Sequence, residues 1–159
     1  PGEVESYAET SDDGRDVLLI AESGQDWVYA SVLYYPDSSD PAGTVEEIQA
    51  YRQEVLDSFL TDMGEEVSSD SGMMGDIAFD EAVTYSEGIL SAIRVFISNG
   101  DLYIASISTY GEPDDVGAQK MMADYFASMQ VDENDITTIK TSFEKVVVPR
   151  PLFFFQAFA

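Results

Sequence analysis

The chain of 159 residues contains no cysteine and no histidine. The first absence removes disulfides, thiol nucleophiles and cysteine-ligated zinc, although it is compatible with any cellular compartment. The second removes the commonest general base, the Ser-His triad and nearly every catalytic zinc site. We therefore expect a protein that is not an enzyme and that holds no metal and no cofactor.

Basic residues are also scarce, because 7 Lys and Arg stand against 31 Asp and Glu, for a formal net charge of −24. Such a surface repels nucleic acid and anionic lipid, so neither is an expected partner. The charge can serve solubility or adaptation to salt. More specific alternatives are cation binding and docking to a basic partner. No apolar run is long enough for a transmembrane segment.

Length and composition indicate one folded domain, since 45% of residues are hydrophobic and 12% are aromatic. We expect a single α+β domain over residues 1–148, with residues 1–15 as a loose lead-in. Residues 149–159 form an apolar C-terminal extension, which we expect to be a strand docked on the domain or on a neighbouring copy. The second possibility would make the protein a homodimer.

The clearest local signal is Asn99-Gly100 between two apolar runs, 89–98 and 101–110. An Asn-Gly pair favours a two-residue type I′ turn, because both central residues need a positive φ angle. This turn places Ile97 opposite Leu102, and both faces of the resulting hairpin are mostly apolar. We therefore expect a central hairpin that is covered on both sides.

Other strands are expected at 16–21, 27–35, 65–70 and 77–86, so that 77–86, 89–98 and 101–110 form a central meander. Helices are expected at about 44–63 and 114–129. The first begins with a capping box of Thr44 and Glu47 and ends at Gly64. The buried residues expected in the second are Val116, Met122, Ala123, Phe126 and Met129. Residues 136–148 fit a helix and a strand equally well.

The order of strands, capped helix, meander and helix resembles the PsbP-like and Mog1-like domains. The resemblance covers roughly residues 16–129. It is carried by these segments: Gly75-Asp76-Ile77-Ala78-Phe79, Ile93-Arg94-Val95-Phe96, Asn99-Gly100-Asp101-Leu102-Tyr103 and Phe126-Ala127-Ser128-Met129. It implies an antiparallel sheet between helices, an α/β/α-type sandwich. Members of that group are mostly non-enzymatic binding proteins, among them exported bacterial proteins and lipoproteins.

Acidic clusters are candidates for metal or catalytic sites. A calcium loop starting at Asp132 fails, because its sixth position is Thr137 rather than Gly and its twelfth is Phe143 rather than Glu. A weaker oxygen-ligand site can be drawn from acidic loop residues, namely Asp12, Asp13, Asp37, Asp40 or the cluster Asp132-Glu133-Asn134-Asp135. Asp80 and Glu81 are adjacent in one strand and point to opposite faces, so they cannot flank one substrate bond.

Arg94 lies in the middle of an apolar strand and must be paired if it is buried. We expect either a structural salt bridge, with Glu81 or an acidic residue of a covering helix, or an anchor for an anionic ligand.

A protein partner is the expected ligand of the domain. The expected contact surface is formed by Trp27, Tyr34, Tyr35, Phe153 and Phe155. These observations favour a non-enzymatic interaction domain of an exported or cell-envelope protein, with its signal peptide outside this sequence. The alternatives are a module that binds cations or a small ligand through its acidic loops, and a protein from the cytoplasm of a halophile.

Overall fold

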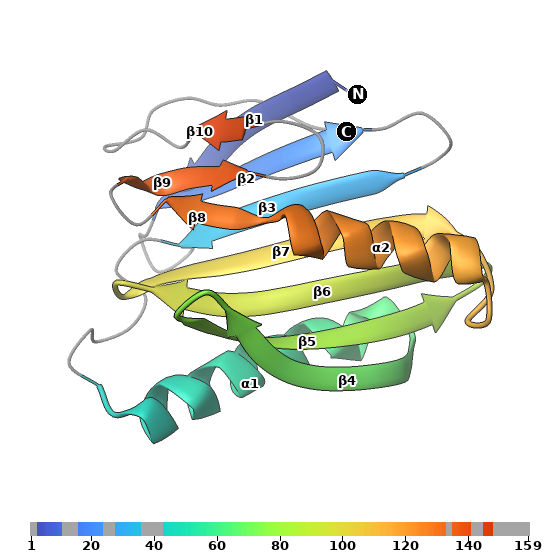
Figure 1. Ribbon diagram of the computed structural model, residues 1–159, viewed down its shortest axis with the longest axis horizontal. Coiled ribbons are helices and arrows are strands. Elements are labelled where there is room, and N and C mark those ends of the chain that lie inside the picture. The colour runs from blue at the N-terminus through green and yellow to red at the C-terminus, as the bar shows by residue number, and fades with distance from the viewer. Residues whose placement is uncertain are drawn as a thin grey trace.

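The computed structural model describes the backbone of residues 3–10, 16–23, 28–35, 43–132, 135–140 and 145–147. Side chains are described for residues 28–35 and 43–129. The expected α+β class is confirmed, since an antiparallel sheet and two helices make up these residues (Figure 1).

The main sheet has seven strands, and every neighbouring pair is antiparallel. Their order across the sheet is β1 (Glu3–Thr10), β2 (Asp16–Ser23), β3 (Tyr29–Tyr35), β7 (Asp101–Tyr110), β6 (Ile89–Ser98), β5 (Ile77–Ser86) and β4 (Glu65–Met74). The sheet therefore joins an N-terminal group of strands to a later one through the pair β3–β7.

The central hairpin has the expected register. Ile97 lies opposite Leu102 and Phe96 opposite Tyr103. Asn99 and Gly100 form the turn with φ angles of 51° and 85°, as a two-residue loop of this kind requires. The turn chemistry thus determines which side chains of β6 and β7 share a face.

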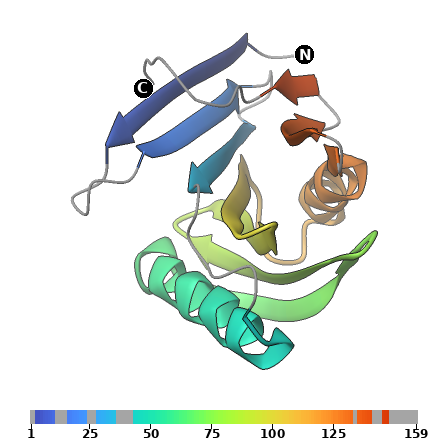
Figure 2. The same ribbon diagram turned by 90° about the vertical axis from the view of Figure 1, so that its left-hand side faces the viewer.

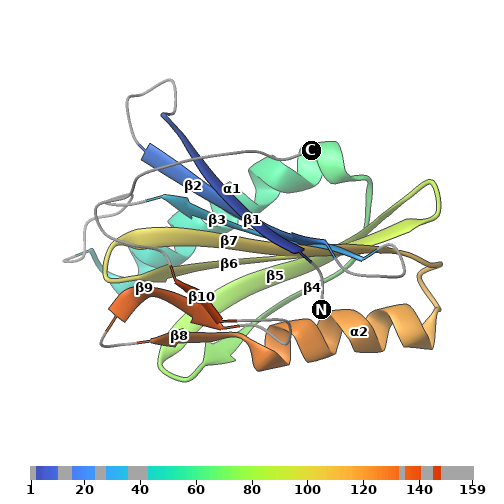
Figure 3. The same cartoon turned by 90° about the horizontal axis from the view of Figure 1, so that it is seen from above.

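Each face of the hairpin has its own hydrophobic cluster. Helix α1 (Val45–Met63) packs on one face, against Ile93, Val95 and their neighbours. Helix α2 (Val116–Ser128) packs on the other face, against Phe96, Tyr103 and their neighbours. Figures 2 and 3 show the two helices on opposite sides of the sheet.

The ends of α1 follow from local chemistry. Thr44 Oγ1 accepts the backbone N–H of Glu47 at 3.2 Å, and Glu47 Oε2 accepts that of Thr44 at 2.8 Å. The helix stops before Gly64, whose φ angle of 109° favours glycine. Both signals were read correctly from the sequence.

A second, smaller sheet follows α2, with strands in the order β10 (Lys145–Val147), β9 (Asp135–Lys140) and β8 (Gln130–Asp132). It lies on the same side of the main sheet as α2 (Figure 2). The ambiguity between helix and strand over residues 136–148 is therefore resolved in favour of strands where the backbone is described.

Two expectations about the N-terminal part and β4 are wrong. Residues 3–10 form the edge strand β1, paired with β2, rather than a loose lead-in. An edge strand can be polar because it needs no second partner strand, so low hydrophobicity misled the interpretation. Strand β4 continues through Met73 and Met74, and the turn is Gly75-Asp76.

The rotation of α2 also differs from the expectation. Val116 is 76% exposed and Ala123 is exposed, whereas Ala118 and Tyr125 are buried beside Met122. The spacing from Ala118 to Met122 to Tyr125 defines one helical stripe, and Val116 and Ala123 lie off it. Several apolar residues lie on each side of this helix, so the sequence pattern alone did not define its buried face.

Candidate functional site

Three large side chains are exposed together at one end of the sheet. Tyr29 is 40% exposed, Ile89 is 40% exposed and Tyr110 is 58% exposed. Ile89 lies directly opposite Tyr110 in the β6–β7 pair, and Tyr29 lies opposite Ser108 in the β3–β7 pair. We call Tyr29, Ile89 and Tyr110 the tyrosine patch.

The tyrosine patch belongs to the face of the sheet that α1 partly covers. Successive residues of a strand alternate between faces, so Ile89 shares a face with Ile93 of the α1 cluster. By the same alternation, Tyr110 shares it with Ile104 and Tyr29 shares it with Leu33. Helix α1 packs mainly on β5 and β6, and at this end of the face Ile89 and Tyr110 remain 40% and 58% exposed.

Serine side chains lie between the patch and the apolar cluster under α1. The hydroxyl groups of Ser31 and Ser106 are 2.8 Å apart, as are those of Ser91 and Ser108. These short side chains are paired with one another across the strands. They form a low, polar floor beside the larger side chains of the patch.

Thr84 extends this polar row onto β5, where it lies opposite Ser91. Its side chain is fully buried, and within the described residues Thr84 Oγ1 has no hydrogen-bond partner. A buried hydroxyl without a partner loses its hydrogen bonds to water and gains none in the protein, so its burial lowers the free energy of unfolding.

We therefore expect Thr84→Val to raise the free energy of unfolding by about 1 kcal/mol, because valine has the same shape without the hydroxyl. Urea denaturation followed by circular dichroism measures this change. Thr109→Val is the matched control, since the Thr109 hydroxyl donates to the carbonyl oxygen of Tyr110 at 3.4 Å. A loss of stability in Thr84→Val would contradict the prediction.

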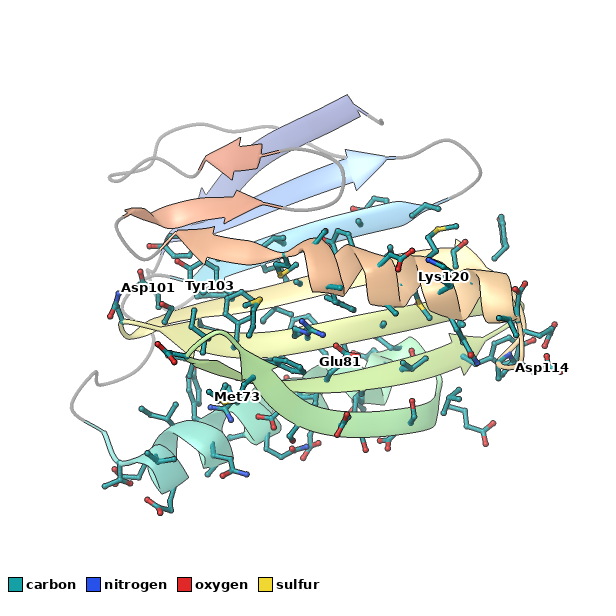
Figure 4. The ribbon with its side chains drawn as sticks, in the orientation of Figure 1. Met73, Glu81, Asp101, Tyr103, Asp114 and Lys120 are labelled. Atoms are coloured by element: carbon teal, nitrogen blue, oxygen red, sulfur yellow. The ribbon has the colours of Figure 1, made fainter. Side chains whose placement is uncertain are left out.

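Acidic residues lie in the segments that border this end of the sheet, and the carboxylate of Glu112 is bound by Tyr85 of the α2 cluster, on the face opposite the patch. Gly111 N–H donates to Gly88 O at 3.1 Å, which holds the β5–β6 turn against the segment that follows β7. Glu87 precedes Gly88 and Glu112 follows Gly111, so both acids belong to this end of the sheet. Asp114 lies at the same end, where β7 leads into α2 (Figure 4).

Glu112 also changes the ionisation of a neighbouring tyrosine. The Tyr85 hydroxyl donates to the Glu112 carboxylate, and this hydrogen bond, with desolvation and the negative charge, raises the pKa of Tyr85 above its ordinary value of 10.0. Folding thus favours the protonated phenol. The resulting stabilisation is present below pH 10 and is lost as the pH rises through the raised pKa.

We expect Glu112→Ala to bring the pKa of Tyr85 back toward its ordinary value. A carbon-13 NMR titration of the tyrosine rings measures this directly. Glu87→Gln is the control and should leave the titration of Tyr85 unchanged. An unaltered Tyr85 titration in Glu112→Ala would show that the hydrogen bond is not the cause.

The charges of the described side chains are unbalanced. Each of the three cations in this part of the chain is in an ion pair: Arg52 with Asp80 at 2.8 Å, Arg94 with Glu81 at 2.6 Å, and Lys120 with Asp124. The first two pairs are buried or nearly so, and only the third is exposed. None of the other described carboxylates forms an ion pair with Arg52, Arg94 or Lys120.

Arg94 projects from β6 toward α2. Its Nε donates to Glu81 Oε2 at 2.7 Å, and its guanidinium carbon lies 3.8 Å and 4.4 Å from the ring centroids of Phe79 and Phe126. Its Nη1 donates to the carbonyl oxygen of Phe126 at 3.5 Å. Helix α2 has no basic residue in its last turn, so Arg94 supplies the positive charge that favours a helix C-terminus. The expected salt bridge with Glu81 is present.

We expect Arg94→Lys to lower the free energy of unfolding by about 1–2 kcal/mol, because lysine cannot stack on two rings and reach Glu81 at once. Urea denaturation measures the loss, and Lys120→Arg at an exposed pair is the control. If Arg94 anchored an anion, phosphate would raise the melting temperature of the unsubstituted protein. We expect no such rise, since Glu81 already pairs with the guanidinium.

The residues predicted as a contact surface are not those of the tyrosine patch. Tyr34 is only 1% exposed and its hydroxyl donates to Asp101 Oδ2 at 3.0 Å, so the prediction is wrong for this residue. Tyr35 is half-buried against the α1 cluster. Trp27, Phe153 and Phe155 lie outside the described residues.

The sequence contains a signal for the tyrosine patch. The correctly predicted hairpin register, continued to the strand ends, already places Ile89 opposite Tyr110 and Ser91 opposite Ser108. The hairpin register does not give the position of α1, and that position decides whether α1 covers this end of the face.

Among the described side chains, no group of three or more acidic residues could hold a metal ion. The acidic residues proposed as a weaker oxygen-ligand site lie where no side chain is described. Asp12, Asp13, Asp37, Asp40 and the Asp132 cluster belong to this set. Within the described part of the chain, neither helix has the length and hydrophobicity of a membrane span.

Tyr29, Ile89 and Tyr110 thus form a group of exposed large side chains on one face of the described sheet. A scan against protein-family models, a search of curated proteins and a search of solved structures each find no match to this chain.

Proposed function

We propose that this chain is a non-enzymatic binding domain of an exported or cell-envelope protein, and that its tyrosine patch contacts a protein partner. The exposure of Tyr29, Ile89 and Tyr110 on one face is the observation that carries the proposal. Tyrosine is enriched at protein interfaces, because its ring buries a large area at little cost in conformational entropy. We also propose that the domain is an α/β/α-type sandwich built on the meander of residues 77–110.

The surroundings of the patch support the same role. A flat sheet face with a floor of paired serines can accept the side chains of a partner between the tyrosine rings. Exposed large side chains that gather on one face more often mark an interaction site than isolated ones do. The resemblance to PsbP-like and Mog1-like domains, mostly binding proteins, points in the same direction.

The acidic residues in the interior support a non-enzymatic role. Asp80 is paired with Arg52, Glu81 with Arg94, and Asp101 accepts a hydrogen bond from Tyr34. Each of these carboxylates already has a structural partner within the fold. None of them is needed as a free acid or base for the proposed role.

A photo-crosslinking amino acid tests the proposal. With p-benzoylphenylalanine in place of Tyr110, irradiation of cells that produce the protein should give a defined adduct with a second polypeptide. The matched control places the same group at Val45, which is 76% exposed at the start of α1. In Figure 1 the start of α1 and the turn between β5 and β6 lie at opposite ends of the sheet.

We expect the adduct at Tyr110, not at Val45, and we expect Ile89→Asp to abolish it. Equal labelling at both positions would contradict the proposal. An adduct of twice the chain mass would identify a second copy as the partner. A melting temperature raised by millimolar calcium, but not by sodium of equal ionic strength, would instead favour the cation-binding alternative.

A further inference from the structure

We infer that the outer edge of β4, over residues 68–74, is a strand-addition site for an extended segment of another protein, with an apolar residue and a basic residue two positions apart. β4 is the last strand of the main sheet on this side, and within the described part of the chain it pairs with β5 alone (Figure 1). Residues 65–71 are all exposed. This edge is separate from the tyrosine patch, and the inference does not depend on the proposed function.

The first support is the direction of the backbone groups of β4. In an antiparallel pair, the N–H and C=O groups of alternate residues point away from the partner strand. Ser71 N–H donates to Oδ1 of its own neighbour Asp70 at 2.8 Å, so Ser71 is one of these outward residues. The pairing of residues 68–74 with β5 is regular, so Ser69 and Met73 are outward residues as well. Their donors and acceptors can pair with an added strand.

The second support is that β4 has few of the features that keep edge strands from pairing. Natural edges are protected by short strands, lysine, proline, bulges or a covering helix. β4 has ten residues without lysine or proline, and α1 packs mainly on β5 and β6. A bulge at Val67, between Glu66 and Ser68, disturbs only its first part. In the regular part, the Asp70 carboxylate occupies the outward N–H of Ser71, which an added strand would use.

The third support is the apolar surface beside Gly72. Gly72 lies opposite Phe79, and a Cβ atom on Gly72 would lie 2.7 Å from Cζ of the Phe79 ring. The half-buried ring therefore extends over the glycine toward the edge of the sheet. An apolar side chain of an added strand would meet this ring directly, in a cross-strand contact of the kind that covers edge glycines. On the other face, Met73 is 62% exposed and offers a second, adaptable contact.

The fourth support is a local pair of like charges. Asp70 lies directly opposite Glu81, and Glu81 is already paired with Arg94. Like charges directly opposite each other destabilise a sheet. A lysine or arginine beside Asp70 would offset this repulsion and would draw the carboxylate away from the N–H of Ser71. Asp70 and Gly72 share a face because they are two positions apart, so one strand can place a basic residue beside the first and an apolar residue beside the second.

A second copy of the chain fits this edge less well. Two β4 strands related by a two-fold axis would bring both Asp70 carboxylates into the short shared segment, on the same face of the joined sheet. β4 contains no basic residue that could lie beside them. The local charges therefore favour a segment of different sequence.

The test uses a capped peptide, Thr-Val-Phe-Thr-Lys-Thr, which in an antiparallel arrangement places phenylalanine beside Gly72 and lysine beside Asp70. One comparison peptide has threonine instead of lysine. Another has N-methyl groups on the three residues that face β4, which removes their backbone donors. Binding to the intact chain is followed by nitrogen-15 NMR and amide hydrogen exchange at physiological salt. We expect the first peptide to slow exchange at Ser69, Ser71 and Met73, and to bind at least about tenfold tighter than either comparison peptide.

Two matched pairs of variants locate the site. Met73→Ser should weaken binding of the lysine peptide by about tenfold, whereas Val67→Ser, at the bulge, should leave it unchanged. In Asp70→Asn the advantage of the lysine peptide over the threonine peptide should fall below about threefold. Asp62→Asn removes the same charge from an exposed position of α1 and should preserve that advantage. Circular dichroism and melting temperature verify that every variant is folded.

Four outcomes would overturn the inference. Equal binding of the N-methylated peptide would show that the backbone of β4 is not used, as would unchanged exchange of its outward amides. An advantage of lysine that survives Asp70→Asn, or that falls equally in Asp62→Asn, would indicate general attraction to an acidic protein. A dimer that Met73→Ser returns to a monomer, measured by light scattering, would identify a second copy as the occupant. The Tyr110 crosslink tests the proposed function separately, and its loss would leave this inference standing.

Discussion

Replacing Asp80 by alanine is expected to lower the free energy of unfolding by about 3–5 kcal/mol. Asp80 is 1% exposed and Arg52 is 7% exposed, and Arg52 Nε donates to Asp80 Oδ2 at 2.8 Å. Ser71 donates to the other carboxylate oxygen at 2.7 Å. The substitution would leave a buried guanidinium without its counter-charge and a serine hydroxyl without its acceptor.

Urea denaturation followed by circular dichroism measures the effect. Asp124→Ala is the matched control, because Asp124 pairs with Lys120 on the exposed side of α2 (Figure 4). Loss of the Asp124–Lys120 pair should change the free energy of unfolding by less than about 1 kcal/mol. The double variant Arg52→Met/Asp80→Leu should recover most of the stability, since neither charge then remains buried. Similar losses in Asp80→Ala and Asp124→Ala would refute the prediction.

Gly64→Ala is expected to lower the free energy of unfolding by an amount on the order of 3 kcal/mol. A Cβ atom on Gly64 would lie 2.5 Å from the carbonyl oxygen of Tyr85 and 2.7 Å from Cβ of Ser86. The φ angle of 109° adds strain for any residue with a side chain. The backbone where α1 leads into β4 would have to move away from β5.

Gly75→Ala separates the two causes of this loss. Gly75 also has a positive φ angle, of 62°, but no atom lies within 4 Å of the position that its Cβ would take. We therefore expect a loss of about 1 kcal/mol from strain alone. The difference between the two alanine variants, measured by urea denaturation, reports the close approach of Gly64 to β5 together with the greater backbone strain at its φ and ψ angles of 109° and −160°. No difference would mean that this approach does not constrain the chain.

The parts of the fold that the sequence predicted well depend on local chemistry. The bounds of β5, β6 and β7 agree with the expectation because Asn99-Gly100 determines the turn and the alternation of side chains then determines both faces. The capping box and Gly64 likewise defined α1. In each case, a few neighbouring residues contain the whole signal.

The parts that were missed depend on contacts between distant segments. Asp80 and Arg52 are 28 positions apart, so no local pattern in the sequence joins them. The sequence signal for this pair is a charge in the middle of an apolar strand together with a second charge on the apolar helix that faces it. The expectation that Tyr34 belongs to a contact surface is wrong for a similar reason, because its buried partner Asp101 lies 67 positions away.

The strand order also has a kinetic consequence. Strands β5, β6 and β7 are joined by two-residue turns, and isolated hairpins of this kind form within roughly microseconds. The pair β3–β7 is different, because its Ser31–Ser106 contact closes a segment of 75 positions. That segment contains α1, β4, β5 and β6. That closure has a large entropic cost before any β3 contact is gained, and proteins dominated by such non-local pairing fold in roughly milliseconds to seconds. The β5–β6–β7 segment is thus expected to act as the folding nucleus, and the arrival of β3 to limit the folding rate.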